Sequence, residues 1–339
     1  MNKVSLIVAT LGERPNDLCA LLRSVMPQTD FIREIIVVDQ HSDPKRIPHL
    51  LEEFENVLPI RHTRSERGLS RARNHGLSSV TGGIVAFPDD DCLYTDGLLE
   101  WVVNWFDSNI EYDILAVGVK DSSGVMSGNR WQQDSCEIGA LNAFRTTFSS
   151  SLFLCADLAT TEKFDVDLGI GSGTAFGCGE ETDYVLRLLS KKARGRFDRT
   201  QCIIHPRRDM LSGSASLPRA LSYGFGMGHV LNLHSLHMLW VGFLIYNLGR
   251  AGISLLRGNQ EGARLCVTQT KGLWKGYLAR TPVRRLQDLA ADSSPQLIQF
   301  TRPQNAGSTE YPIPSALRGA SLRNVDEITK ADAGGSREL

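Results

Sequence analysis

Short, mainly apolar runs recur through the first part of the chain, and each is followed by a segment with the pattern of a helix. The runs lie at residues 4–9, 35–38 and 84–87. A continuous apolar run is typical of a strand that is covered on both faces. Strands that alternate with helices in this rhythm form parallel sheets. The alternation therefore predicts an α/β fold with a mostly parallel sheet flanked by helices.

Polar residues follow these runs where the predicted strands end. Thr10 closes the first strand, Asp39 closes the second, and Asp89, Asp90 and Asp91 come shortly after the last. In an open sheet of this class, ligands bind in the crevice outside the carboxyl ends of the strands. No G-x-G-x-x-G follows the first strand, which counts against a dinucleotide fingerprint. We therefore expect a different ligand at this edge.

The three adjacent aspartates repel one another unless a cation lies beside them. Two like charges about 4 Å apart cost on the order of 4 kcal/mol at an effective dielectric constant near 20. A divalent ion reverses the sign of that interaction, and oxygen ligands suit Mg²⁺ or Mn²⁺. Taken alone, the run fits an aspartate-rich turn that caps the next helix as well as it fits a metal site.

A second acidic cluster follows a glycine-rich stretch at 169–179. Glu180, Glu181 and Asp183 come next, before apolar residues at helical spacing. The glycines allow a loop to close over a ligand. Acids at a helix N-terminus are also favoured by the helix dipole whatever their function. By itself, the cluster indicates the start of a helix more strongly than it indicates a site.

His205 ends a predicted strand at 201–204 and is followed by Arg207 and Arg208. A single histidine at a strand end is usually structural, but two neighbouring arginines favour contact with phosphate. His205 is therefore a candidate ligand for a metal or a phosphate.

Composition excludes some classes of function. The 339 residues carry a formal net charge of -1, which gives no electrostatic reason to expect nucleic-acid binding. The seven cysteines include no C-x-x-C pair, so neither a disulfide framework nor a zinc knuckle is indicated. We expect a reducing, cytoplasmic location.

The C-terminal part has a different character. Within residues 236–256, the run 238–246 is apolar on every side and a second apolar piece follows at 253–256, so the stretch is too short and too interrupted for a clean membrane span of about 20 residues. Basic residues dominate from 250 to 285, where Glu261 is the only acid. The apolar segment therefore either packs on the rest of the protein or lies on an anionic membrane surface. We expect residues 231–290 to form a helical, basic extension and residues 291–339 to be a disordered tail.

These motifs, taken in order, resemble the family 2 glycosyltransferases of the GT-A fold, especially bacterial enzymes that build surface polysaccharides and transfer rhamnose or related sugars. The resemblance covers about residues 3–230 and rests on five segments. They are the strand that ends at Thr10, the strand that ends at Asp39, a G-x-x-x-A-R-N segment at 68–74, a D-x-D motif at 89–91, and a G-x-E-D-x-D-like segment at 179–187.

The resemblance implies a Rossmann-like GT-A domain at 1–230, with a nucleotide-binding half at 1–120 and an acceptor or catalytic half at 121–230. It implies a site that holds a nucleotide-diphospho-sugar and a divalent cation, Mn²⁺ or Mg²⁺. The donor would be bound by Thr10, Asp39, Arg71, Asn74, Asp89 and Asp90. The metal would be held by Asp91, Asp89 and His205.

One position departs from the family pattern. Glu181 stands where the family usually has its catalytic aspartate, so the base is Glu181 or its rival Asp183, and Glu180 orients the acceptor or the loop. The implied reaction is inverting transfer of a hexosyl or deoxyhexosyl group from a UDP-, dTDP- or GDP-sugar to a glycan or lipid-linked acceptor. A nucleotidyltransferase and a non-catalytic scaffold of the same fold, binding glycan or a partner, are the alternatives.

Overall fold

The computed structural model describes residues 2–126, 132–206 and 216–279. The chain divides into two units, Met1–Gln299 and Phe300–Leu339, and every described residue belongs to the first. The predicted disordered tail, Arg207 and Arg208 lie outside the described residues.

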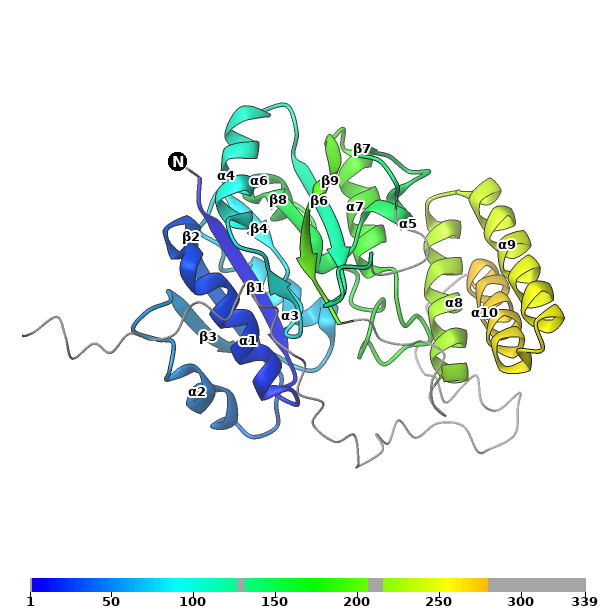
Figure 1. Ribbon diagram of the computed structural model, residues 1–339, viewed down its shortest axis with the longest axis horizontal. Helices are drawn as coiled ribbons and strands as arrows, with labels where there is room; N and C mark the ends of the chain where they lie inside the picture. Colours follow the sequence, from blue (N-terminus) through cyan, green and yellow to red (C-terminus); the bar gives the residue numbers. More distant parts are fainter. Residues whose placement is uncertain (1, 127–131, 207–215, 280–339) are drawn as a thin grey trace, which may run out of the picture. The chain divides into compact units, whose positions relative to one another are not determined.

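A nine-stranded sheet forms the centre of the described unit (Figure 1). The strands run in the order β3-β2-β1-β4-β8-β6-β9-β5, and β7 pairs with β9. The longest pairings, β1 with β2 and β6 with β9, are parallel, whereas the antiparallel pairings of β4, β5, β6 and β7 are shorter. The predicted mostly parallel α/β sheet is confirmed. The bounds are β1 Val4–Thr10, β2 Ile32–Asp39, β3 Ile60–Arg64, β4 Ile84–Ala86, β5 Leu93–Tyr94, β6 Ile114–Lys120, β7 Cys136–Ile138, β8 Leu152–Cys155 and β9 Gly195–Ile204.

Helices cover both faces of the sheet because successive side chains of each strand point to opposite sides. On β1, Leu6 and Val8 belong to the core beneath α1 and α4, whereas Ile7 belongs to the core beneath α3 and α7. α3 lies so close that a Cβ at Gly76 would be 2.4 Å from Ile7 Cγ2. The bounds are α1 Pro15–Val25, η1 Met26–Phe31, α2 Arg46–Leu51, α3 Leu69–Leu77, α4 Leu98–Ser108, α5 Ala143–Thr146, η2 Ser149–Ser151, α6 Ala156–Ala159 and α7 Glu180–Ser190.

β9 is longer than the apolar pattern indicates, because the sequence predicted only residues 201–204. The polar residues that precede this run, from Gly195 onward, extend the strand between β6 and β7. Pairing on both sides satisfies the backbone of this half, so it forms a strand without a continuous apolar run.

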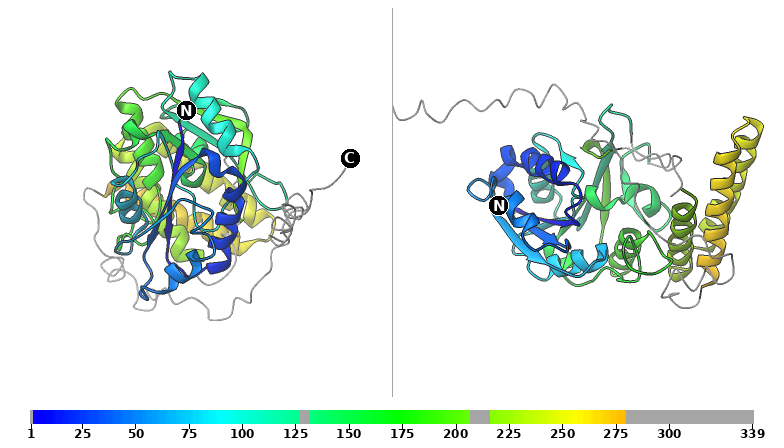
Figure 2. Two further views of the ribbon diagram at one scale, coloured as in Figure 1. Left: turned by 90° about the vertical axis from the view of Figure 1, so that its left-hand side faces the viewer. Right: turned by 90° about the horizontal axis from the view of Figure 1, so that it is seen from below.

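Three further helices, α8 Ser216–Leu233, α9 His237–Leu256 and α10 Gln260–Leu278, form a group at the end of the described unit away from β2 and β3 (Figures 1 and 2). The predicted C-terminal helical extension is therefore present. α8 ends at Leu233, so it crosses the boundary that the sequence suggested at residue 230. Its most extensive packing is on α10. The division into domains stays a prediction.

Glycines let α8 and α10 approach until their backbones meet. A Cβ at Gly224 of α8 would be 2.3 Å from a backbone oxygen of α10, and a Cβ at Gly276 of α10 would be 2.1 Å from the backbone oxygen of Phe225. Gly228 and Gly272 are equally enclosed. No side chain fits between these helices at these four positions.

The same helix packs against the segment that leads into α7. A Cβ at Gly226 of α8 would be 2.1 Å from the carbonyl oxygen of Cys178. The backbone N–H of Gly177 donates a hydrogen bond to the carbonyl oxygen of Ser222 at 3.2 Å. α8 therefore fixes the N-terminus of α7 to the C-terminal helices.

The glycine contact predicts opposite effects of one substitution at two helical positions. Gly276→Ala should destabilise the protein by about 1–3 kcal/mol, because its methyl group overlaps the facing backbone. Gly249→Ala on α9, where nothing lies within 4 Å, should stabilise it by about 0.5–1 kcal/mol through helix propensity. Urea unfolding of both variants measures this difference. Equal effects would contradict the close packing.

Candidate functional site

The acidic run lies at the carboxyl ends of the parallel strands. Asp89 forms a parallel bridge with Ala9 of β1. The hydroxyl of Thr10 donates a hydrogen bond to Asp90 Oδ2 at 2.7 Å and accepts one from the backbone N–H of Gly12 at 3.0 Å. Residues 80 positions apart in the sequence are thereby joined at one edge of the sheet.

Arg14 is a cation of this site that sequence reasoning missed. Its guanidinium group donates hydrogen bonds to Asp91 Oδ2 and to Asp90 Oδ1, one from each terminal nitrogen. The residue stands directly before α1, in the loop that follows β1. Because that loop must cross the crevice at the strand ends, a positive residue in it was a usable signal.

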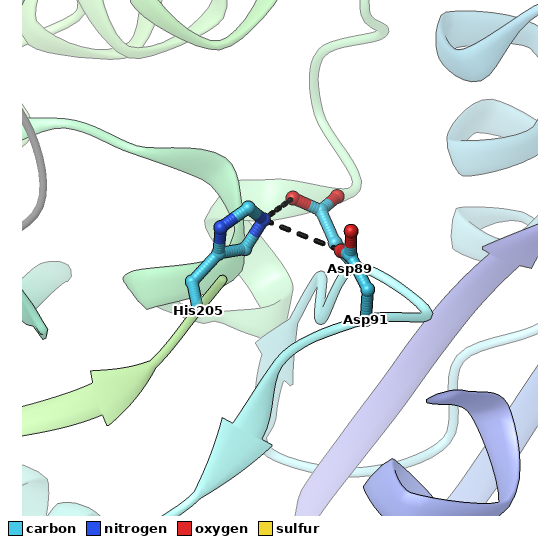
Figure 3. Close-up of side chains that lie close together, drawn as sticks. All are labelled: Asp89, Asp91 and His205. Carbon is cyan, nitrogen blue, oxygen red and sulfur yellow. Dashed lines mark ion pairs between the residues drawn. The ribbon is translucent and has the colours of Figure 1, made fainter. Parts of the chain in front are cut away.

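His205 approaches the acidic run from the end of β9 (Figure 3). Its Nε2 lies 3.3 Å from Asp91 Oδ1 and 3.6 Å from Asp89 Oδ2. Its Nδ1 lies 3.0 Å from the carbonyl oxygen of Pro206. Because a carbonyl oxygen accepts hydrogen bonds, Nδ1 is the donor in this contact. Nε2 is the ring nitrogen that faces the two carboxylates.

These three side chains fit a divalent cation. One ligand atom from each of Asp89, Asp91 and His205 lies within 4.8 Å of the others. Burial raises the pKa of Asp89, but the hydrogen bond from His205 and the charge of Arg73 outweigh burial and hold the pKa below its ordinary value. The carboxylate is therefore ionised at neutral pH. Two carboxylates and one imidazole nitrogen are ligands that Mn²⁺ or Mg²⁺ would accept.

Arg73 of α3 joins the acidic run to the second acidic cluster. Its terminal nitrogens donate to Ser149 Oγ at 2.7 Å, to Asp89 Oδ1 at 3.3 Å and to Glu180 Oε1 at 3.4 Å. Its guanidinium carbon lies 5.4 Å from the ring centre of Phe164. The residue is only 1% exposed. One buried cation therefore positions two carboxylates that lie 91 positions apart in the sequence.

The N-terminus of α7 presents three carboxylates in three environments. Glu180 is held by Arg73 and packs against Gly169, where a Cβ would lie 2.8 Å from Glu180 Cδ. Asp183 accepts hydrogen bonds from Arg187 Nε and His234 Nε2, each at 2.9 Å. Although burial raises the pKa of Asp183, these partners lower it below its ordinary value. Asp183 therefore ties α7 to the end of α8.

Glu181 is the remaining carboxylate. In the part of the chain that the structure describes, it forms no ion pair. Burial, together with the negative charge of Glu180, raises the pKa of Glu181 to about 8. A carboxylate with a pKa near the working pH, at the start of a helix, has the properties of a general base. Of the three predicted candidates, Glu181 is the one whose charge is least committed to a structural contact.

The other predicted donor residues lie in separate contacts. Asp39 is fully buried and accepts a hydrogen bond from the backbone N–H of His41 at 2.7 Å. Its second oxygen lies 3.2 Å from His62 Nε2 and 3.5 Å from Arg64 Nε, two residues of β3 that sequence reasoning did not select.

Within the G-x-x-x-A-R-N segment, only Arg73 reaches the acidic run. Asn74 Oδ1 accepts a hydrogen bond from the backbone N–H of Phe164 at 2.7 Å, and Asn74 Nδ2 donates one to the carbonyl oxygen of Phe164 at 2.8 Å. Arg71 donates a weak hydrogen bond of 3.4 Å to the carbonyl oxygen of Arg67. Arg73 stands between them and faces the core. The helical spacing of buried Ser70, Arg73 and Leu77 was the signal for this orientation.

Several known proteins are similar to this chain in sequence. The family described as Glycosyl transferase family 2 matches residues 5–166. The minor teichoic acid biosynthesis protein GgaB of Bacillus subtilis is 26% identical over 185 residues, which cover 51% of this chain and 19% of that protein. Polypeptide N-acetylgalactosaminyltransferase 10 of Mus musculus is 31% identical over 106 residues, which cover 30% of this chain and 16% of that protein. The chain thus spans less than a fifth of the length of these curated relatives.

Solved structures show the same fold. Residues 1–349 of S. aureus TarS superpose with a TM-score of 0.53 at 14% identity, covering 82% of this chain and 93% of that one. The same protein in complex with UDP-GlcNAc gives a TM-score of 0.51 at 15% identity, with the same two coverages. At this identity the likeness concerns the fold, and it confirms the predicted GT-A-like architecture.

Removal of the Arg73 charge should destabilise the protein. Arg73→Leu leaves two carboxylates without their shared cation, and breaking a buried ion pair on one side costs about 3–5 kcal/mol. Arg71→Leu, in the same helix but less buried, should cost less than about 1 kcal/mol. Urea denaturation at neutral pH compares the two variants. Equal stabilities would show that Arg73 does not hold the acidic groups together.

Proposed function

Because residues 5–166 belong to glycosyl transferase family 2, we propose that this protein transfers a sugar from a nucleotide-diphospho-sugar to an acceptor hydroxyl with inversion of the anomeric centre. The observation that carries the proposal is the Arg73 contact. The guanidinium group of Arg73 donates to Asp89 of the acidic run through one terminal nitrogen and to Glu180, at the acidic start of α7, through the other. A transferase needs this arrangement, with a site for the leaving diphosphate beside a base for the acceptor.

Glu181 is the proposed base. Its carboxylate takes the proton of the acceptor hydroxyl as that oxygen forms a bond to the anomeric carbon, and the bond between that carbon and the diphosphate oxygen breaks. The electron pair of the broken bond leaves with the nucleoside diphosphate. A single displacement of this kind inverts the anomeric centre. Glu180, held by Arg73, orients the start of the helix.

Thr10, Asp39 and Asp90 are the proposed contacts of the nucleotide, and Arg71 and Asn74 stay predictions for the sugar. Arg14 supplies positive charge beside the position that the family resemblance gives to the diphosphate. A divalent ion held by Asp89, Asp91 and His205 would supply Lewis-acid stabilisation of the departing diphosphate. The donor is linked to UDP, dTDP or GDP, and the TarS complex with UDP-GlcNAc supports the first of these.

The acceptor that we propose is a glycan or a lipid-linked saccharide in polysaccharide biosynthesis, and the supporting observation is the similarity to a teichoic acid biosynthesis protein. Nucleotide sugars are cytoplasmic metabolites and a lipid-linked acceptor is membrane-bound. We therefore place the reaction in the cytoplasm, with peripheral contact to the inner face of the plasma membrane.

Donor turnover should depend on metal and on Asp91. Purified protein is incubated with a panel of UDP-, dTDP- and GDP-sugars, with Mn²⁺, Mg²⁺ or a chelator, and release of nucleoside diphosphate is measured. We expect one nucleotide class to be hydrolysed slowly with metal, and Asp91→Asn to lower the rate about 10²-fold or more, because stabilisation of the leaving group is lost.

Leu141→Asn, at a position 73% exposed, is the control and should retain the rate. Binding of donor without turnover under every condition would favour a non-catalytic scaffold. Pyrophosphate release from a nucleoside triphosphate and a sugar phosphate would instead favour a nucleotidyltransferase.

The pH dependence of transfer should report Glu181. Because its pKa is raised to about 8, the rate should rise as pH increases through that value, where the carboxyl loses its proton. Glu181→Gln should lower the transfer rate about 10²–10⁴-fold and abolish this rise of the rate with pH. Glu181→Asp should keep the pH dependence at a lower rate. A rise with pH that persists in Glu181→Gln would assign the base to another group.

The pH dependence of the free energy of unfolding gives an independent measure of the ionisation of Glu181. The unfolded carboxyl ionises near 4.5 and the folded one near 8. Between these values the native state binds more protons, so the stability contributed by protonated Glu181 is lost as pH rises. Relative to Glu181→Gln, the unsubstituted protein should therefore lose stability between about pH 4.5 and 8.

A further inference from the structure

One face of α9 is apolar and exposed. Six of its apolar residues are each more than half exposed, namely Met238 82%, Ile245 66%, Leu248 54%, Ile253 51%, Leu255 60% and Leu256 90%. The opposite face, with Phe243, Asn247 and Ala251, is buried. In the described part of the chain, α9 is the one helix long and apolar enough to cross a membrane. Soluble proteins rarely leave an apolar surface of this kind uncovered.

Positive charge is concentrated on α9 and on α10, the helix that packs against it. From His237 to the end of α10 the chain carries five arginines and lysines, and Glu261 is the only acid. Arg250 lies on α9 and Arg257 at its end, whereas Arg264, Lys271 and Lys275 lie on α10 and are exposed. An exposed apolar face on a pair of helices that is rich in cations is complementary to the surface of an anionic bilayer.

Exposed aromatic rings stand beside the same cations. Trp274 of α10 is 50% exposed, and its ring centre lies 5.0 Å from that of Trp240 on α9. Tyr246 is 41% exposed, with the guanidinium group of Arg250 5.7 Å from its ring centre. Tryptophan and tyrosine are enriched at the boundary between water and hydrocarbon, where their amphipathic rings sit at headgroup level.

We propose that α9 lies in the plane of an anionic membrane surface, with its apolar face in the boundary between headgroups and acyl chains and with Lys271 and Lys275 of α10 on the headgroups. This specifies the membrane contact of the proposed function, but it does not depend on sugar transfer.

Two other arrangements fit the contacts less well. A spanning α9 would draw α10, which packs along it, into the hydrocarbon together with Lys271 and Lys275. Pairing of two copies through this face would bring two positively charged helix pairs together, since a two-fold interface repeats each residue on both sides. An anionic surface attracts these cations, whereas a second copy repels them.

Vesicle flotation tests the surface. Full-length protein is mixed with vesicles of phosphatidylcholine alone or with added phosphatidylglycerol. We expect binding only to the anionic vesicles, and weaker binding in high salt. Each cation near such a surface is worth about a fivefold change in affinity. Lys271→Gln combined with Lys275→Gln should therefore weaken binding about twentyfold.

The apolar face is tested by Ile245→Glu combined with Leu248→Glu, which should weaken binding by about a hundredfold or more because charge enters the boundary region. The matched control is Val57→Glu combined with Ile110→Glu, at positions 49% and 88% exposed elsewhere in the fold. This control should bind as the unsubstituted protein does. Equal binding of both double variants would overturn the assignment of the face.

Depth measurements separate the orientations. Spin labels on cysteines introduced at Met238, Ile245 and Leu256, corrected for labelling of the native cysteines, should report one shallow depth at all three positions. A label deep in the hydrocarbon at Ile245 alone would show that α9 spans the membrane.

Absence of vesicle binding, with a dimer in solution that Ile245→Glu and Leu248→Glu dissociate, would make a second copy the occupant. Donor hydrolysis by these variants is measured in parallel. A protein that binds vesicles but hydrolyses no donor would contradict the proposed transferase and leave the docking surface in place.

Discussion

The site depends on how two arginines hold a crowded set of carboxylates. Arg14 pairs with Asp90 and Asp91, and Arg73 pairs with Asp89 and Glu180. Each arginine is a planar donor that serves two acids at once, a geometry that lysine does not provide. Without these contacts the carboxylates would repel one another in a partly dry crevice, and their positions at the strand ends would not be maintained.

The same principle separates structural acids from the proposed reactive one. Asp183 is ionised and accepts hydrogen bonds from His234 and Arg187, so its charge stabilises the contact between α7 and the end of α8. Glu181 lacks such a cation among the described residues, and its pKa rises to about 8. Two acids two positions apart thus differ in protonation because of their partners. Their order in the sequence carries no such information.

Much of the fold was predictable because strand periodicity and turn residues are local signals. The strands that end at Thr10 and Asp39 followed from apolar runs, and they are parallel as expected. The polar half of β9 was not predictable, because its pairing with β6 and β7 is non-local. The acidic run and His205 were identifiable as chemical types. Local signals placed Arg14 in the loop after β1 and Arg73 on the buried face of its helix. Which carboxylates they contact depends on crossings between loops and helices that single-sequence patterns do not report.

An acidic crevice that carries its own counter-charges differs from a metal centre that assembles only around its ion. With Arg14 seated on Asp90 and Asp91, the loop after β1 and the turn after β4 are already joined. The chain can therefore complete this domain during synthesis, before it meets any ion or nucleotide. Folding and ligand binding are then separate events, and a shortage of divalent ions would not expose the core of this domain.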